Sequence, residues 1–461
     1  MSASEGAVRE VDVVVIGLGP GGESAAGRLA KAGLTVVGVE QGLVGGECPY
    51  VGCTPSKLLV RAAHTLSEAH HAEDLGGRVE VSPDFSLPAR RIAESTNQWT
   101  DDTHVQRLTD AGAELVRGRG RLDGPGRVVV ETEAGSVELV ATRGVVLGTG
   151  TAPATLPIDG LDGTPYWTNR EVFRITEPPA SLVVVGGGAI GCELAQAFAR
   201  FGVEVTLLEV ADRIVGPEEP EVSEVLRRVL VRDGIDVRTG VSIDRVSYDG
   251  GFHLEVDRAT LAVERLLVAA GRTTQLAGLG LETVGLDPDA EAIETDERCR
   301  AGERLWAVGD ITGKGAYTHV ARYQSGCVVR DILGEGGPWA SYHSVTRVTF
   351  TDPEIGAVGL TEEEAREAGV PVVTSVVDIP RSSRGWMHGE GNDGLVKLVA
   401  DAERRVLVGA SVVAPYGGEV LGLLSAAVHA EIPLAVLRTM HYAYPTFHRT
   451  IEVAVERLEL K

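Results

Sequence analysis

Residues 11–40 read VDVVVIGLGPGGESAAGRLAKAGLTVVGVE, and this stretch decides the fold. The continuous apolar run at 11–16 predicts a strand that is buried on both faces. Glycines at 17–22 predict a turn, and residues 23–33 have the apolar spacing of a helix. A second apolar strand is expected at 35–40. Strand, glycine turn, helix and strand together make one βαβ unit, which is typical of a parallel sheet in an α/β domain.

The same pattern returns much later, in SLVVVGGGAIGCELAQAFARFGVEVTLLE at 181–209. Each Gly-x-Gly-x-x-Gly turn lets the backbone approach a pyrophosphate, and the helix that follows presents its partly positive N-terminus. An acid stands 23 residues after the first glycine of each copy, at Glu40 and Glu209, where it suits a pair of ribose hydroxyls. The repeat predicts two dinucleotide sites, whose cofactor-binding glycines are Gly17, Gly19, Gly22, Gly186, Gly188 and Gly191.

The acid at Glu209 favours NADH over NADPH, because a carboxylate accepts from a 2′-hydroxyl and repels a 2′-phosphate. Arg213 leaves NADPH open, since a nearby guanidinium could hold that phosphate; the other interpretation of Arg213 is a solvated surface charge. Two dinucleotide sites in one chain indicate electron transfer between two cofactors. Nicotinamide with flavin is the common pairing, so we expect NAD(P)H and FAD.

A cysteine-containing segment, GGECPYVGCTPSK at 45–57, follows the first βαβ unit. Cys48 and Cys53 are near enough along the chain to form a disulfide if the local geometry allows it. Pro55 and the helical spacing after it predict a helix that begins near Cys53, which would lower a thiol pKa. A half-built metal site and two unrelated buried thiols are the alternatives. The spacing of further ligands does not suit a metal, so a redox role is favoured and no metal site is expected.

The other three cysteines, Cys192, Cys299 and Cys327, are interpreted as isolated buried structural thiols. Five cysteines in 461 residues do not make a secreted disulfide scaffold. The N-terminal sequence is polar and acidic, unlike a signal peptide, and the longest apolar stretches are about half of the ~20 residues that a membrane span needs. These features predict a cytoplasmic protein without a membrane partner.

Composition limits the partners further. Asp and Glu number 66 against 43 Lys and Arg, for a formal net charge of −23. Nucleic acids and anionic membrane surfaces need a cationic footprint, so both are excluded as expected partners. The length suggests roughly three domains.

The domain organisation follows from these patterns. A Pro- and Gly-rich stretch at 152–163 marks a boundary, and from about residue 343 strand-like and helical segments alternate as in an α+β domain. We expect two Rossmann-like domains and an α+β C-terminal domain. The expected segments are 1–153 and 276–342 for the FAD-binding and central domain, 154–275 for the NAD(P)-binding domain, and 343–461 for the C-terminal domain.

With these motifs the chain resembles the flavoprotein disulfide reductases, the family of dihydrolipoamide dehydrogenase, glutathione reductase and mercuric reductase. The resemblance extends over nearly the whole chain. It rests on GGECPYVGCTPSK and both glycine turns, and on LGTGTAP (147–153), VAAGR (268–272), WAVGD (306–310) and VTFTDPEIGAVGLTEEEA (348–365).

The resemblance implies roles for single residues. Cys53 is expected next to the flavin, Cys48 is expected to exchange with the outer substrate, and Lys57 with Glu193 matches the family's ion pair beside the flavin. Asp310 is expected to bind the ribityl chain of FAD. Further cofactor contacts are implied at Gly46, Thr149, Gly150 and Gly271. The segment from about residue 343 resembles the family's dimerisation domain, which implies a homodimer.

The C-terminal segment HYAYPTFHRTIE (441–452) departs from the family. Disulfide-reducing members carry a His before Pro-Thr and a Glu five residues after that His, which together protonate the leaving thiolate. Here Tyr444 and Arg449 stand at these two positions, and a phenol is a poor base at neutral pH. His441 and His448 could substitute, although their offsets differ; the alternative is that they are surface or interface histidines.

These features predict an FAD-dependent NAD(P)H oxidoreductase with a Cys48–Cys53 redox disulfide and a nonstandard small-molecule acceptor. That acceptor could be an unusual small disulfide, a quinone or a metal ion. A mercuric reductase in the strict sense is not expected, because mercuric reductases end in a cysteine pair and this chain has no cysteine after Cys327. One alternative is a dihydrolipoamide-dehydrogenase-like enzyme that uses another proton donor. An alternative of a different class is a flavin-bound redox sensor or scaffold with little turnover.

Overall fold

The computed structural model describes residues 8–459. The chain forms two compact units. Unit 1 comprises residues 1–55, 93–154 and 272–342, and unit 2 comprises residues 56–92, 155–271 and 343–461. The finer division into four segments stays a prediction.

Unit 1 is built on an eight-stranded sheet. Its main order is β16 (Arg300–Gly302), β17 (Leu305–Ala307), β6 (Gly135–Leu147), β1 (Arg9–Ile16), β2 (Val36–Glu40) and β3 (Glu114–Arg117), and β4 (Arg119–Leu122) and β5 (Arg127–Thr132) extend it from β6. Strand β1 runs parallel to both β2 and β6. The βαβ unit expected from the sequence is therefore confirmed.

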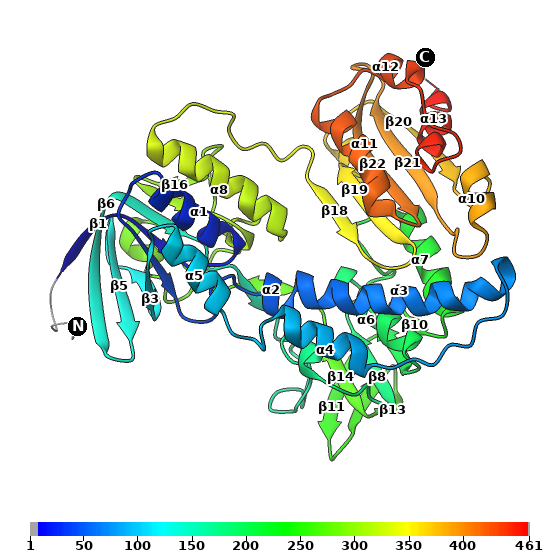
Figure 1. Ribbon diagram of the computed structural model, residues 1–461, viewed down its shortest axis with the longest axis horizontal. Coiled ribbons are helices and arrows are strands. Elements are labelled where there is room, and N and C mark those ends of the chain that lie inside the picture. The colour runs from blue at the N-terminus through cyan, green and yellow to red at the C-terminus, as the bar shows by residue number, and fades with distance from the viewer. Residues whose placement is uncertain (1–7, 460–461) are drawn as a thin grey trace. The chain divides into compact units, whose positions relative to one another are not determined.

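Alternate residues of β1 face opposite layers of unit 1. Val13 and Val15 pack beneath the helices α1 (Pro20–Lys31), α5 (Asp102–Asp110) and α8 (Thr318–Leu333). Figure 1 shows α1 and α8 side by side over the sheet. Val14 and Ile16 face the layer that contains β4 and β5. Because both faces are covered, the strand is apolar throughout rather than alternating.

Shorter elements complete unit 1. The strands β7 (Thr151–Pro153) and β15 (Arg272–Thr274) pair antiparallel. Helix α2 (Cys48–Val51) precedes the long helix α3 (Cys53–Leu75), which begins in unit 1 and continues into unit 2, and α4 (Ser86–Ser95) also crosses the boundary. Two 3-10 turns, η2 (Leu281–Val284) and η3 (Asp310–Thr312), follow later in the chain.

Unit 2 contains a second parallel sheet, in the order β10 (Asp236–Arg238), β9 (Glu204–Leu208), β8 (Ser181–Val185) and β14 (Arg265–Val268). Helices α6 (Ala189–Arg200) and α7 (Pro220–Arg232) connect its strands, after the short turn η1 (Val172–Arg174). The antiparallel strands β11 (Ile243–Tyr248), β12 (Phe252–Val256) and β13 (Ala259–Val263) form a separate small sheet. This second βαβ arrangement also confirms the sequence pattern.

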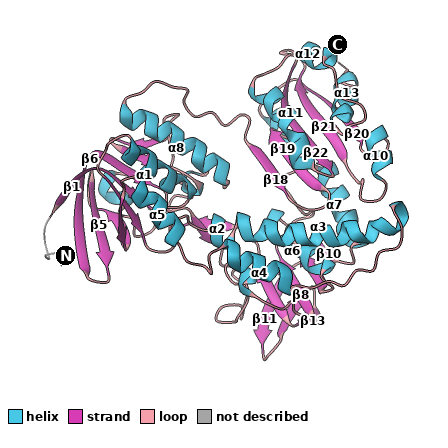
Figure 2. Cartoon of the chain, in the orientation of Figure 1, coloured by secondary structure: helices cyan, strands magenta, loops and turns pink. Residues whose placement is uncertain are grey.

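The C-terminal part of unit 2 is a five-stranded antiparallel sheet with helices (Figure 2). Its order is β18 (Thr346–Thr349), β19 (Glu354–Gly359), β22 (Val406–Ala414), β21 (Leu395–Asp401) and β20 (Val372–Asp378). The accompanying helices are α9 (Glu362–Glu367), α10 (Ser383–His388), α11 (Gly417–His429), α12 (Leu434–Thr439) and α13 (His448–Glu456). Apolar residues of the sheet, α11, α12 and α13 share one core, as an α+β domain requires.

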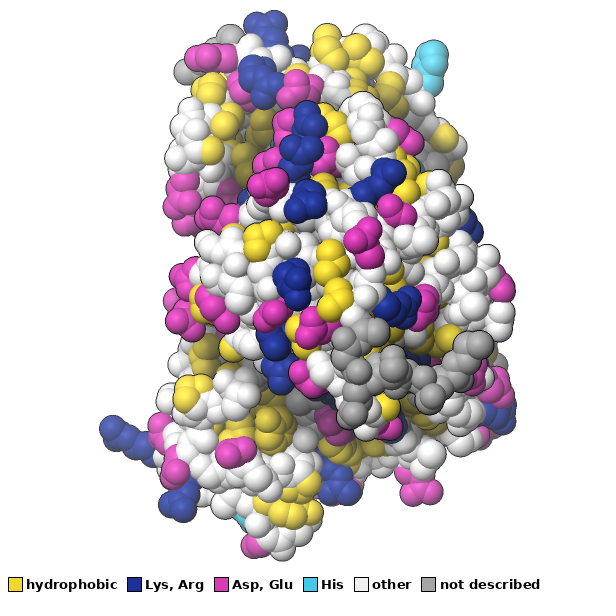
Figure 3. Space-filling model, turned by 90° about the vertical axis from the view of Figure 1, so that its left-hand side faces the viewer, with side chains coloured by type: hydrophobic (Ala, Val, Ile, Leu, Met, Phe, Trp, Pro, Cys, Tyr) yellow, Lys and Arg dark blue, Asp and Glu magenta, His cyan; other side chains and the backbone are white. Residues whose placement is uncertain are grey.

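One face of the molecule shows how charged side chains are distributed over it. On the face drawn in Figure 3, basic and acidic side chains of the described residues are interspersed, and the basic ones form no continuous patch. Among the helices within residues 8–459, none has both the length and the hydropathy that crossing a bilayer requires.

Candidate active site

The first glycine turn has no room for a side chain at its first and last glycines. Gly17 has a φ of +87°, and a Cβ added there would lie 2.6 Å from the carbonyl oxygen of Gly148. A Cβ on Gly22 would lie 2.0 Å from the Gly17 carbonyl oxygen. Helix α1 begins directly after Gly19, which is its N-cap. The turn therefore brings bare backbone and a helix N-terminus to one place, as pyrophosphate binding requires.

Glu40 is fixed by two backbone groups at the end of β2. The Leu18 N–H donates to Oε2 at 2.7 Å, and the Gly42 N–H donates to Oε1 at 2.8 Å. Each carboxylate oxygen has a further lone pair that can accept from a ribose hydroxyl. Glu40 thus ties the glycine turn to the strand end and remains chemically suited to a ribose.

Two further features of unit 1 fit a bound dinucleotide. Gly46 has a φ of +67°, and a Cβ there would lie 2.8 Å from the Cα of Gly19, so the two glycine segments touch. The Thr149 hydroxyl is buried and has no hydrogen-bond partner among the described residues. A buried polar atom without a partner is costly, and a ligand at this turn would supply the partner. The residues present therefore fit FAD.

Asp310 opens the 3-10 turn η3 and accepts a hydrogen bond of 3.0 Å from the Thr151 hydroxyl. Between Thr149 and Thr151, Gly150 has a φ of +68° and would meet nothing within 4 Å if it carried a Cβ. The LGTGTAP and WAVGD segments, far apart in sequence, thus come together beside one open stretch of backbone.

The second glycine turn, in unit 2, repeats the geometry of the first. Gly186 has a φ of +108°, and its added Cβ would lie 2.6 Å from the Ala269 carbonyl oxygen. A Cβ on Gly191 would lie 1.9 Å from the Gly186 carbonyl oxygen, whereas Gly188 and Gly271 face open space. This turn has the same backbone requirements as the first and suits a second dinucleotide.

Glu209 occupies the place in this turn that Glu40 has in the first. The Gly187 N–H donates to its Oε2 at 2.6 Å, and the Ala211 N–H donates to its Oε1 at 2.8 Å. Arg213 is partly buried and donates to the Gly216 carbonyl oxygen at 2.5 Å, so it is not a fully solvated charge. Two backbone groups therefore fix the Glu209 carboxylate at this turn, as they fix Glu40 at the first.

The two cysteines of the GGECPYVGCTPSK segment lie in contact. Cys48 begins α2, and Cys53 begins α3, at the helix start that the sequence predicted. The Cys48 side chain is hydrogen-bonded to Cys53, and this bond together with burial raises the pKa of the Cys48 thiol. The Thr318 hydroxyl lies 3.5 Å from the Cys53 sulfur. Cys53 is exposed and Cys48 half-buried, and both are free thiols.

A salt bridge that the sequence reasoning missed holds the segment before Cys48. Arg272 donates to the Glu47 carboxylate at 2.5 Å and to the Thr151 hydroxyl at 2.7 Å. Thr151 in turn donates to Asp310. Glu47 lies in the motif GGECPYVGCTPSK and Arg272 in the motif VAAGR. No local pattern could reveal that residues so distant in sequence are paired.

Lys57 and Glu193 form an ion pair in unit 2. Lys57 lies one helical turn after Cys53 on α3, and its Nζ is 2.7 Å from Glu193 Oε2. The other carboxylate oxygen accepts from the Phe350 N–H at 2.8 Å, and the Phe350 ring lies 4.8 Å from Lys57 Nζ. Glu193 is 3% exposed. Its buried charge is therefore fully satisfied, and it holds the ammonium group in one place.

The residues that replace the family's acid–base pair contact each other. The Arg449 guanidinium lies over the Tyr444 ring, 5.4 Å from its centroid, and is also 3.6 Å from Glu452. Tyr444 is 63% exposed. His448 begins α13 and is partly buried, whereas His441 is exposed. A guanidinium over a phenol ring offers hydrogen-bond donors but neither the imidazole nor the carboxylate of the family's acid–base pair.

One interpretation of the remaining cysteines was wrong. Cys192, Cys299 and Cys327 are all buried, as expected. Cys299 and Cys327, however, are not isolated, because their side chains are hydrogen-bonded to each other. Their contact joins the segment before β16 to helix α8, and sequence spacing gives no sign of it.

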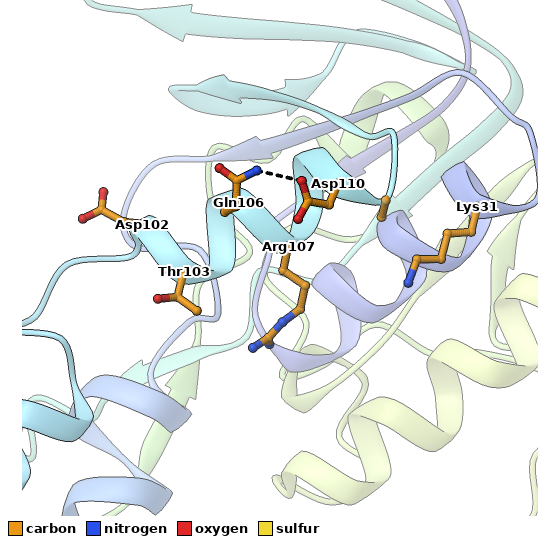
Figure 4. A pocket seen from close by; sticks show the side chains of 7 residues that line it. Lys31, Asp102, Thr103, Gln106, Arg107 and Asp110 are labelled. Carbon is orange, nitrogen blue, oxygen red and sulfur yellow. Dashed lines mark hydrogen bonds between the residues drawn. The ribbon is translucent and has the colours of Figure 1, made fainter.

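A surface groove of about 720 Å³ lies elsewhere on unit 1 (Figure 4). Its lining comes from Lys31, at the end of α1, and from residues of α5 such as Gln106 and Asp110, which are hydrogen-bonded at 2.7 Å. The glycine turn is at the opposite end of α1. The groove therefore belongs to neither dinucleotide turn.

Two family models match the chain. The model described as pyridine nucleotide-disulphide oxidoreductase covers residues 11–325, and the dimerisation domain of the same family covers residues 345–455. Among curated relatives, dihydrolipoyl dehydrogenase of Chlorobaculum tepidum is 33% identical over 100% of this chain and 99% of the relative. Mercuric reductase of Bacillus cereus is 31% identical over 97% of this chain and 71% of the relative.

Solved structures of similar proteins agree over nearly the whole chain. The Cu(II) complex of the HOCl-induced flavoprotein disulfide reductase RclA from Escherichia coli has a TM-score of 0.85 and 26% identity, over 98% of this chain and 100% of that one. LpdA from Mycobacterium tuberculosis has a TM-score of 0.86 and 26% identity, over 97% of this chain and 100% of that one. These matches extend through both glycine turns and the C-terminal sheet.

Proposed function

Because this chain belongs to the pyridine nucleotide-disulphide oxidoreductase family, whose members contain FAD and use NAD(P)H, we propose a specific route for its electrons. They pass from NAD(P)H through FAD to the Cys48–Cys53 pair, and from there to a nonstandard acceptor. The observation that carries the proposal is the contact of these two thiols at the start of α3, in a chain whose acid–base positions hold Tyr444 and Arg449.

Each cofactor has its own glycine turn. FAD would be held by Gly17, Gly19, Gly22, Glu40, Gly46, Thr149, Gly150 and Asp310, and the nicotinamide nucleotide by Gly186, Gly188, Gly191, Glu209 and Gly271. The flavin, when bound, accepts a hydride and passes two electrons to a disulfide. The Glu209 carboxylate, oriented by Gly187 and Ala211, favours NADH.

Cys53 and Cys48 have different roles in the proposed route. Cys53 faces the flavin in this proposal, and Cys48 exchanges with the acceptor. The hydrogen bond between them keeps Cys48 protonated when both are reduced, because it raises the pKa of the Cys48 thiol. Lys57, held by Glu193, supplies a fixed positive charge one helical turn after Cys53. The dimerisation domain supports a homodimer, and the acidic, cysteine-poor chain suits the cytoplasm.

The number of protons that each acceptor consumes on reduction limits which acceptor suits this site. Reducing an outer disulfide releases a thiolate that must be protonated, and reducing a quinone consumes two protons per molecule. The family's His and Glu, which would handle that proton, are replaced here by Tyr444 and Arg449. Reducing a metal ion consumes electrons alone: the dithiol becomes a disulfide and two protons leave to water, while two Cu(II) ions take one electron each or one Hg(II) ion takes both. A reducible metal ion is therefore the acceptor that this site suits best.

The metal would be a transient substrate. Within residues 8–459, no group of three or more His, Cys, Asp and Glu side chains could hold a resident ion. The pair of thiols at Cys48 and Cys53 offers two soft ligands, which suit Cu or Hg. Relatives named mercuric reductase and a relative solved as a Cu(II) complex support this class of acceptor.

The test is a screen of acceptors with pre-reduced holoenzyme. Cu(II), a benzoquinone, lipoamide and glutathione disulfide are compared at equal concentration under anaerobic conditions, and reoxidation is followed by flavin absorbance. Oxidation by Cu(II) at least about tenfold faster than by either disulfide would support the proposal. Faster oxidation by a disulfide would overturn the metal-ion assignment.

One alternative is favoured by the full-length match to dihydrolipoyl dehydrogenases. In that case His441 or His448 supplies the proton. Rapid lipoamide turnover that is lost in His448→Gln or His441→Gln would establish it.

An enzyme that is reduced by NADH but passes electrons to none of the four acceptors would instead act as a flavin-bound redox sensor.

A further inference from the structure

The second cysteine pair lies in unit 1, apart from the segment that carries Cys48 and Cys53. Cys299 and Cys327 are both 0% exposed and belong to one apolar cluster. Their side chains are hydrogen-bonded to each other, and this contact raises the pKa of Cys299 and lowers that of Cys327. Two thiols in such contact are a short movement from a disulfide of ~2 Å bond length.

The backbone holds Cys299 in an unusual conformation. Its φ is +62°, a region that few residues other than glycine adopt. Its N–H donates to the Asp296 carbonyl oxygen at 3.0 Å, and its carbonyl oxygen accepts from the Ala307 N–H at 3.1 Å. The backbone of Cys299 is thus held by a turn on one side and by strand β17 on the other.

Positive charge surrounds Cys327. The Arg330 guanidinium, one turn later on α8, donates to its sulfur at 3.4 Å. The contact with Cys299 and then the charges of Arg330 and, on α1, Arg28 lower the pKa of Cys327 to about 7 against the opposing effect of burial. The nearby Asp296 acts on Cys299 and raises its pKa instead. Cys327 therefore has the features of a nucleophilic thiolate, and Cys299 those of a thiol that resolves it.

Hydrogen bonds connect the pair to the Asp310 turn. The Tyr342 hydroxyl lies 4.0 Å from Cys299 Sγ and accepts from Gln324 Nε2 at 3.0 Å. Gln324 also donates to the Thr312 hydroxyl at 2.9 Å and accepts from the Gly309 N–H at 2.6 Å. Gln324 is completely buried. It therefore links the sulfur of Cys299 to both sides of the turn that presents Asp310.

We propose that Cys299 and Cys327 form a second redox site, which peroxide closes to a disulfide and which acts on the flavin-binding turn through Tyr342 and Gln324. The Cys327 thiolate attacks one oxygen of the peroxide, the O–O bond breaks, and hydroxide leaves. The Cys299 sulfur then attacks the sulfenic sulfur, the S–S bond forms, and a second hydroxide leaves. The two thiol protons convert both hydroxides to water, so one peroxide oxidises one pair.

Only a small oxidant can reach this pair. The segment over it, residues 335–342, has no helix or strand. Ala340 of this segment packs against the apolar cluster that contains both cysteines. The Tyr342 hydroxyl lies 4.0 Å from Cys299 Sγ. Irregular segments open at lower free energy than helices or sheets, which admits peroxide but not a large disulfide. This distinguishes the second pair from the exposed Cys53, and the proposal does not depend on the identity of the acceptor.

The test uses the full chain, loaded with FAD, in a Cys48→Ser/Cys53→Ser background. Three cysteines remain, and we expect stoichiometric hydrogen peroxide to reduce the free thiols counted after denaturation from about three to about one. Peptide mass mapping should join the peptides of Cys299 and Cys327. Cys192→Ala is the matched buried-thiol control and should retain the link, whereas Cys299→Ala should abolish it.

A second readout tests the connection to Asp310. Closing the disulfide removes the S–H of Cys299 and draws its sulfur toward Cys327, which changes its contact with the Tyr342 hydroxyl, so FAD affinity should fall about two- to tenfold on oxidation. In a Tyr342→Phe variant the disulfide should still form, but the affinity should no longer respond. Any of three results after peroxide would overturn the redox site. They are a count of three free thiols, a sulfinic acid without a cross-link, and oxidation of Cys192 instead of Cys299 and Cys327. An unchanged FAD affinity in the cross-linked protein would overturn the connection.

Discussion

The two thiol pairs of unit 1 share a hydrogen bond between sulfurs but differ in almost everything else. Cys48 and Cys53 are five positions apart, lie at successive helix starts and reach the surface. Cys299 and Cys327 are 28 positions apart and are completely buried. Exposure therefore separates the pair proposed to exchange electrons with a substrate from the pair proposed to react only with a small oxidant.

The two pairs also differ in how the nearby cation is held. Lys57 follows Cys53 by one turn of α3, and its partner Glu193 fixes it. Arg330 follows Cys327 by one turn of α8 and donates directly to the sulfur. A cation in the turn after a cysteine is thus used twice. In the buried pair it touches the thiol, and in the exposed pair it is held by a carboxylate.

The largest effect is expected from the exposed pair. Cys48→Ser or Cys53→Ser should lower NADH-driven reduction of any acceptor by about 10³-fold or more, because the electrons then have no dithiol to reach. Anaerobic reduction of the flavin by NADH should persist and serves as the internal control. In contrast, Cys299→Ala should retain turnover at saturating FAD. Equal losses from both pairs would remove the distinction between them.

The second effect concerns Tyr444 and Arg449, which stand at the family's acid–base positions in the C-terminal segment. Tyr444→His combined with Arg449→Glu should raise turnover with lipoamide by about 10²-fold, the usual contribution of general acid–base catalysis. Reduction of Cu(II) should not change, because it needs no proton. Steady-state rates with both acceptors check this. An unaltered lipoamide rate would show that the missing acid–base pair is not the limit.

A smaller effect is expected at the buried pair and depends on pH. The pKa of Cys327 is lowered to about 7, so the reactive thiolate forms as the pH rises through that value. The rate of peroxide-driven disulfide closure should rise over the same range. Arg330→Gln removes the cation and should move this profile to higher pH, which lowers the rate at pH 7 by about tenfold.

Two controls make the profile specific. Arg330→Lys keeps the charge and should retain most of the rate at pH 7. Arg28→Gln removes a charge that acts without a hydrogen bond to the sulfur, and should have a smaller effect. A profile that is identical in wild type and Arg330→Gln would contradict the role of the guanidinium.

The smallest effect is on stability. Glu193→Gln removes the carboxylate opposite Lys57 but keeps an oxygen for the Phe350 N–H. The free energy of unfolding should fall by about 1–2 kcal/mol, less than for a fully buried pair because Lys57 is 35% exposed. Urea unfolding measures it. Glu193→Ala, which also leaves the Phe350 N–H without its acceptor, should cost more, and no difference between the two variants would count against that bond.

Local patterns were enough to predict some features. Both glycine turns, and Cys53 at a helix start, follow from residues within about one βαβ unit, because backbone conformation and helix capping are local. The structure adds that Glu40 and Glu209 accept two backbone N–H groups each in matching positions. The sequence spacing had already placed both carboxylates at strand ends.

Long-range contacts were not predictable in this way. The pairing of Glu47 with Arg272, and of Cys299 with Cys327, depends on how distant segments pack, and periodicity carries no information about it. The Tyr444–Arg449 contact is intermediate. Its two positions were identified from the family pattern, but their contact through a cation over a ring depends on the turn that precedes α13.

The central claim is that reducing equivalents from NADH come to rest on Cys48 and Cys53. An anaerobic NADH titration of the FAD-loaded protein tests it most directly. The account predicts uptake of about two equivalents, with a long-wavelength absorption band after the first, and about one equivalent without the band in Cys48→Ser/Cys53→Ser. Uptake of a single equivalent by the wild-type protein, with no band, would contradict it.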